Sequence, residues 1–212
     1  MAKKITYSAP TVAEYKKMTK AQKRVAIAKD IIASINSKKY IANASTYIDN
    51  VEIDGKSVDV RYDYLDDKDI EELDIQETLP RMEKCKVCAM GACILSLTKY
   101  ENKLTFADIG PNISEFSETT DKLLKGVFTP EQLAMIEIMF EGYYSDVEYD
   151  HEDYKQRGNN YSRDRLGAIV SDEDALKCIK WHWKKKKRGI TDDNLMIAIW
   201  KNIVDNEGEL VL

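Results

Sequence analysis

Residues 129–142 constrain the fold most, because they carry the start and stop signals of one helix at the correct spacing. Thr129 suits the N-cap, Pro130 suits the first helical position, and Gln132 completes a capping box with Thr129. Gly142 then supplies the C-terminal stop. An apolar stripe at helical spacing predicts one buried face, formed by Leu133, Ile136 and Phe140. A helix with such a face has to be covered by other elements.

Similar signals predict further helices. Thr19 and Gln22 form a capping box ahead of a second apolar stripe, and Thr191 precedes a third. The predicted ranges are 20–37, an acidic helix at 66–77 that ends near Pro80, a cysteine-containing helix at 85–101, a lysine-rich helix at 171–189, and a last helix from Thr191 to near Gly208. Residues 1–18 are polar and are predicted to form a flexible N-terminal arm.

One hairpin is predicted around Asp54–Gly55, because apolar residues alternate on both sides of this turn dipeptide. With a two-residue turn, Val51 faces Val58, and Tyr47 faces Tyr62. Asp49 and Lys56 interrupt the apolar face, which favours a peripheral hairpin. An extended piece is predicted over 103–109.

These elements predict a mainly α fold of the α+β class, in which a helical domain carries a small peripheral β-hairpin. The domain is expected to span residues 19–212, with a long loop at 143–161. No internal repeat of 20–50 residues is visible.

Composition restricts the compartment and the partners. The formal net charge of −5 argues against a dedicated non-specific DNA coat, although a local patch can still bind phosphates. The first residues form no apolar leader, and no stretch approaches the ~18 apolar residues of a membrane span. We therefore expect a protein of the cytoplasm that does not contact a membrane, and four cysteines that are reduced.

Four segments resemble a group of bacteriophage-encoded accessory proteins that carry no assigned activity. They are Lys23–Ile32, Cys85–Ala92, Phe128–Glu137 and Asn194–Val204. The resemblance implies a phage accessory protein that acts in the cytoplasm of the bacterial host, and it supplies no catalytic residues. The lysine-rich helix departs from the pattern of that group, so it is a place for a specialised activity.

The lysine-rich helix at 171–189 concentrates seven cations in an acidic protein. Ser171 suits its N-cap and Gly189 its end, with acids in the first turn and bases in the last. At about 100° per residue, Leu176, Ile179 and Trp183 fall on one side. The opposite side is basic and consists of Lys177, Lys180, Lys184, Lys187 and Arg188.

Two interpretations of this basic side remain open. It is either a solvated face that balances the acids of the protein, or a binding surface for an anionic partner, with Trp181 exposed to stack on a base. The partner would be an acidic host protein, a nucleotide or a nucleic acid. An alternative nucleotide-binding set lies in the preceding segment and consists of Arg157, Tyr161, Arg163 and Arg165.

Metal and catalytic sites are less well supported. Cys85 and Cys88 have zinc-ligand spacing, and the remaining ligands would come from Cys93, Cys178, His151 and His182. A second ligand pair at such spacing is missing, so we interpret the cysteines as core residues that bind no metal. His182 is interpreted as a boundary residue of its helix.

Nuclease-like acid and lysine groupings occur at Asp66–Asp67–Lys68 and at Asp150, Asp153 and Lys155, and groupings of this kind arise readily in a chain with 33% charged residues. Phosphate-binding glycine motifs are missing from the sequence. The sequence therefore predicts a non-enzymatic protein without a cofactor, able to form a homo-oligomer, that binds and neutralises a host component in counter-defence. The alternative is sequestration of a nucleotide signal or nucleic acid, and a zinc- or metal-dependent enzyme comes third.

Overall fold

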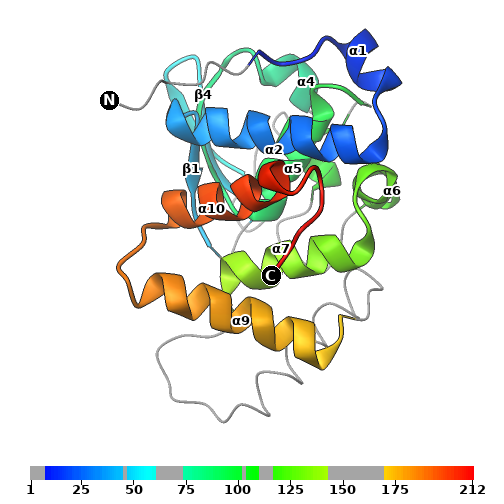
Figure 1. The fold of residues 1–212 in the computed structure, drawn as a ribbon. Helices are drawn as coiled ribbons and strands as arrows, with labels where there is room; N and C mark the ends of the chain where they lie inside the picture. Colours follow the sequence, from blue (N-terminus) through cyan, green and yellow to red (C-terminus); the bar gives the residue numbers. More distant parts are fainter. Residues whose placement is uncertain (1–7, 45–46, 61–73, 102–103, 110–116, 143–169) are drawn as a thin grey trace.

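The computed structural model describes residues 8–44, 47–60, 74–101, 104–109, 117–142 and 170–212, and Figure 1 shows their arrangement. The helices are α1 (Val12–Lys17), α2 (Lys20–Asn36), α4 (Ile75–Thr78), α5 (Ala89–Thr98), α6 (Glu118–Val127), α7 (Pro130–Glu141), α9 (Asp172–Lys186) and α10 (Asp192–Asp205), with a 3-10 turn η2 (Phe106–Asp108). The strands are β1 (Tyr40–Ala42), β2 (Ile48–Ile53), β3 (Lys56–Asp59) and β4 (Met82–Val87). This is an α+β fold, as predicted.

Helix α5 lies at the centre of the molecule, and all ten of its residues are buried. Figure 1 shows α2 and α10 side by side, and α10 also packs on α7, which in turn carries α9. Gly91 allows the backbone of Tyr47 to lie against α5, since a Cβ there would overlap the carbonyl oxygen of Tyr47. Among the described residues, no helix is long and apolar enough to cross a membrane.

Capping explains where several helices begin. The side-chain oxygens of Thr19 and Thr129 each accept a hydrogen bond from the backbone N–H of the third helical residue. That residue is Gln22 in α2 and Gln132 in α7, and its side chain accepts a hydrogen bond from the backbone N–H of the threonine, which completes a capping box. Thr191 caps α10 in the same way from its side chain. Gly142 ends α7 with a left-handed φ of 66°. The helices predicted from these signals are confirmed.

The predicted hairpin is present, but it is not peripheral. Val51 pairs with Val58 as expected, whereas Tyr62 lies outside the described residues. Strand β2 also pairs with β4 inside a four-stranded mixed sheet of order β1-β4-β2-β3, and Val51 is fully buried. Only β3 of the hairpin is an edge strand, because β2 is paired with β3 on one side and with β4 on the other.

The predicted cysteine helix at 85–101 is wrong in its first part. Residues 82–87 form β4, and Cys88 is the N-cap of α5. Cys85 and Val87 are buried on either side of the exposed Lys86, as in a strand, and a register shift opposite Glu52 and Ile53 separates Met82 from this alternation. Lys84 reaches across to Glu52 on β2 at 3.1 Å, which is a cross-strand pair.

The described part of the N-terminal arm also differs from its prediction. Residues 12–17 form α1, with a capping box between Thr11 and Glu14. Tyr15 is fully buried and stacks on Tyr100, with ring centroids 4.3 Å apart. The buried ring of Tyr15 contributes a large contact area between this short polar segment and the core.

Two other predicted segments are described only in part. Residues 61–73 lie outside the described residues. The predicted acidic helix at 66–77 is wrong at Asp74, which has extended backbone angles and caps α4, so the described helix begins only at Ile75. Of the extended piece at 103–109, Thr105 forms one bridge with Asp74, and residues 106–108 form η2. A polar cap at Thr105 therefore turns the chain where an extended piece was predicted.

Candidate functional site

Helix α9 contains the basic surface predicted from the sequence. Ser171 accepts a hydrogen bond from the backbone N–H of Asp174 at 3.1 Å and caps the helix. Lys187 is the C-cap, and Gly189 follows with a left-handed φ of 75°. The predicted helix at 171–189 is confirmed, with its ends set by these caps.

The buried face of α9 is rotated relative to the prediction. Ile179 is buried as expected, while Leu176 and Trp183 are only partly buried. The residues that face inward are Ala175, Cys178, Ile179 and His182. This face of α9 packs on α7.

His182 joins α9 to the end of α7, so its interpretation as a boundary residue is wrong. The residue is 4% exposed, and its Nδ1 lies 3.0 Å from the Met139 carbonyl oxygen. A Cβ on Gly142 would overlap the imidazole ring. Burial lowers the pKa of His182, and the hydrogen bond to Met139 offsets part of that effect. A neutral imidazole donating Nδ1–H satisfies this geometry.

The outer face of α9 is exposed as predicted, and its first turn is neutralised locally. Lys177 pairs with Glu173 at 3.0 Å and with Asp174 at 3.2 Å. These hydrogen bonds raise the pKa of Lys177, with Glu173 the larger cause. Farther along, Lys186 pairs with Asp192. Exposed pairs of this kind contribute little stability, but they cancel charge.

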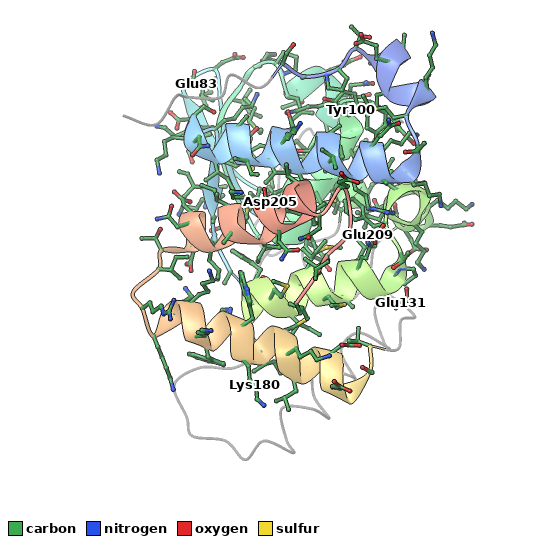
Figure 2. The ribbon with its side chains drawn as sticks, in the orientation of Figure 1. Glu83, Tyr100, Glu131, Lys180, Asp205 and Glu209 are labelled. Carbon is green, nitrogen blue, oxygen red and sulfur yellow. The ribbon has the colours of Figure 1, made fainter. Side chains whose placement is uncertain are left out.

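Four exposed cations on α9 and its C-terminal turn form no ion pair within the described part of the chain. We define them as the basic surface: Lys180, Lys184, Lys187 and Arg188. Figure 2 shows Lys180 extending from the side of α9 that faces away from α7. The spacing of i, i+4, i+7 and i+8 keeps the four on one side, over a length of about 12 Å.

Trp181 is less open than the prediction of an exposed stacking platform requires. It is half-buried and packs against the core. The ammonium group of Lys185 lies 5.2 Å from its ring centroid, a cation–π geometry. A base that stacked on this face of the ring would have to displace Lys185.

The alternative nucleotide set of Arg157, Tyr161, Arg163 and Arg165 lies outside the described residues. The same holds for the loop at 143–161, and for the acid and lysine groupings at 66–68 and at Asp150, Asp153 and Lys155.

The cysteines are distributed over β4, α5 and α9. Cys85 lies on β4, Cys88 caps α5, Cys93 lies within α5 and Cys178 lies on α9, and all four are buried free thiols. Burial raises the pKa of Cys178 to about 12 and raises the other three as well. The metal ligand is the thiolate, which burial disfavours. Among the described residues, no group of three or more His, Cys, Asp and Glu side chains is placed to hold a metal ion.

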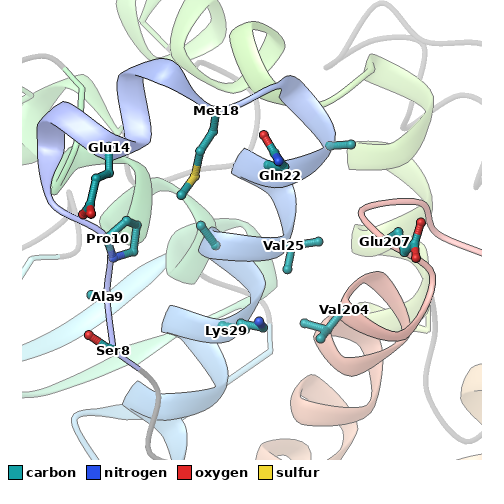
Figure 3. A pocket seen from close by; sticks show the side chains of 12 residues that line it. Ser8, Ala9, Pro10, Glu14, Met18, Gln22, Val25, Lys29, Val204 and Glu207 are labelled. Atoms are coloured by element: carbon teal, nitrogen blue, oxygen red, sulfur yellow. The ribbon is translucent and has the colours of Figure 1, made fainter.

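Sequence reasoning missed a groove of about 820 Å³ along the outer side of α2. Figure 3 shows Pro10 and Glu14 on one side of it, Val25 and Lys29 on α2, and Val204 on α10. The walls come from segments far apart in the chain, so no local pattern indicates them.

Comparisons with known proteins give no further information about this site. No family model, no curated protein and no solved structure matches the chain.

Proposed function

We propose that this chain is a non-enzymatic binding protein, a phage accessory protein that docks an acidic face of a host protein on the basic surface of α9 and neutralises that host protein in counter-defence. One observation carries the proposal: four exposed cations on one side of a capped helix and its C-terminal turn form no ion pair within the described part of the chain. The likeness of four segments to phage accessory proteins supports the setting in the bacterial cytoplasm.

The physical state of the basic surface suits an acidic protein. Complementary charges steer association and fix the register of a complex, and they need no deep pocket. The buried side of α9 is fixed by His182 and Ile179, so the charges stand on a formed helix. Little ordering of the backbone would be needed on binding.

The second candidate is a nucleotide signal or a nucleic acid. The basic surface offers phosphate contacts, and Trp181 offers a ring for stacking. The placement of Lys185 over this ring favours the protein partner, because stacking would cost the cation–π contact.

A charge-reversal experiment tests the proposal. The change is Lys180→Glu, Lys184→Glu and Lys187→Glu together. A matched control places the same change of charge on exposed residues of α1 and α2, as Lys16→Glu, Lys17→Glu and Lys20→Glu. Both variants should keep the fold, since exposed substitutions usually change stability by about 0.5 kcal/mol or less each.

The measurement is pull-down from host cells, followed by titration with the captured protein. We expect the α9 variant to lose binding and biological activity and the control to keep both. Binding should also weaken with salt, since charges are screened beyond about 10 Å at 0.1 M ionic strength. Full binding by the α9 variant would show that the basic surface is exposed to solvent but does not contact the partner.

Trp181→Ala separates the two partner classes. If the partner is a protein that binds through its acidic side chains, we expect Trp181→Ala to change its affinity little. A strong loss that is insensitive to salt, together with absorbance near 260 nm in the purified protein, would indicate base stacking instead. Zinc content measured in the same preparation tests the metal-dependent alternative.

A further inference from the structure

A second cationic site lies in a small pocket beside α4, at the end of the molecule opposite to α9 (Figure 1). Lys39 enters it from the link between α2 and β1, and Lys99 enters it from the C-cap of α5. The rest of the wall comes from Gln76 on α4 and from Leu79 and Pro80 directly after it. Three separate segments thus bring two lysines to one pocket in an acidic chain.

Both ammonium groups are held in place. The Lys99 Nζ lies 2.6 Å from the Asp30 carboxylate, whose side chain is only 9% exposed. The Lys39 Nζ donates to the Leu79 carbonyl oxygen at 2.7 Å. Each ammonium carries three N–H donors, so each retains donors beyond these bonds. An anion in the pocket would meet charges that are already positioned.

Among the described residues, two positive charges share one carboxylate at this pocket. Asp30 pairs with Lys99, and it is the one acid side chain of the described part of the chain that raises the pKa of Lys39. Burial lowers the pKa of Lys39, and the positive charge of Lys99 lowers it further. The Nζ of Lys99 lies 5.8 Å from the centroid of the Tyr40 ring. Burial raises the pKa of the Tyr40 hydroxyl, so Tyr40 adds no negative charge. A bound anion would relieve the repulsion between the two lysines.

The size of the pocket restricts the ligand. Its volume is about 290 Å³. This is at the lower end of the range of about 300–1,000 Å³ for small-molecule sites. A single phosphate group fits within this volume. Lysine binds phosphate as a point charge, and the Gln76 amide can add a neutral donor.

We propose that this pocket binds a small phosphate anion between the ammonium groups of Lys39 and Lys99. The site is independent of the basic surface on α9 and does not rest on the function proposed above. It stands on the convergence of two fixed lysines and one amide in one pocket.

The test is a titration of the full-length protein with inorganic phosphate, at constant ionic strength against chloride, followed by amide chemical shifts. We expect saturable shifts centred on Lys39, Gln76 and Lys99. Lys39→Ala should weaken binding about tenfold or more, as expected for loss of a hydrogen bond between charged groups. Lys39→Arg should retain binding because it keeps the charge.

Lys180→Ala is the matched control, since it removes one positive charge from the basic surface of α9 and leaves the pocket intact. It should bind phosphate as the parent protein does. Shifts that fail to saturate, shifts centred on α9, or equal affinity in Lys39→Ala would overturn the proposal. A nucleoside monophosphate that binds far more tightly than phosphate would also overturn it, since the pocket would then be part of a larger site.

Discussion

Helices α9 and α10 follow each other in the chain and are nearly equal in length, at 15 and 14 residues, yet they have different surroundings. Helix α10 packs on α2, α7 and β1, while α9 packs mainly on α7. Trp200 on α10 is fully buried, whereas Trp181 and Trp183 on α9 are only partly buried. The comparison indicates that α10 stabilises the fold and that α9 presents the basic surface to solvent. Substitutions on α10 should therefore lower the free energy of unfolding more than substitutions on α9.

The largest effect is expected at Trp200. Its ring is fully buried and meets Phe128 edge-on, with centroids 6.1 Å apart. Trp200→Ala should lower the free energy of unfolding by about 3–5 kcal/mol, measured by urea denaturation. Lys201→Ala on the exposed side of α10 is the control, and it should cost about 0.5 kcal/mol or less. If Trp200→Ala lowered the free energy of unfolding no more than Lys201→Ala does, the buried face of α10 would not stabilise the fold, and the contrast with α9 would be wrong.

A smaller effect is expected where α9 is attached. Gly142→Ala places a Cβ at a left-handed φ and against the His182 ring. We expect a loss of about 2 kcal/mol, from backbone strain and steric overlap together. In the His182→Ala background the overlap disappears, so the same change should cost less. Equal losses in both backgrounds would show that the ring does not contact Gly142 in solution.

The smallest effect is a pH dependence at the same contact. The pKa of His182 is lowered in the folded state by burial, while in the unfolded chain it stays near 6.5. The unfolded state therefore binds more protons below this value, and stability falls as the pH drops below about 6.5. His182→Gln should flatten the slope between pH 7.5 and 5.5 in urea denaturation. An unchanged slope would assign the pH dependence to other groups.

Much of the helical framework could be predicted, because capping residues act locally. Thr19, Thr129 and Thr191 each specify a helix start through their own side chains, and Gly142 specifies a stop. The turn at Asp54–Gly55 fixed the pairing of Val51 with Val58 for the same reason. Such signals do not depend on what the element later packs against.

What failed depends on tertiary contacts. The cysteine segment has small residues that suit a helix, and only pairing with β1 and β2 makes Cys85 part of a strand. The burial of His182 depends on the end of α7, which lies 43 residues away in sequence. The pocket between Lys39 and Lys99 likewise exists only after α4 has docked. The spacing of apolar residues along the sequence does not indicate which distant segments these residues contact.

One contact has a consequence for the order in which the chain folds. The buried Arg24 on α2 donates to the carbonyl oxygens of Val127 and Gly208, the latter 184 residues away, and its guanidinium also pairs with Glu209. A buried guanidinium without acceptors is costly. Contacts of such high sequence separation slow folding. During synthesis, Arg24 can complete this set of contacts only after Gly208 and Glu209 have been made.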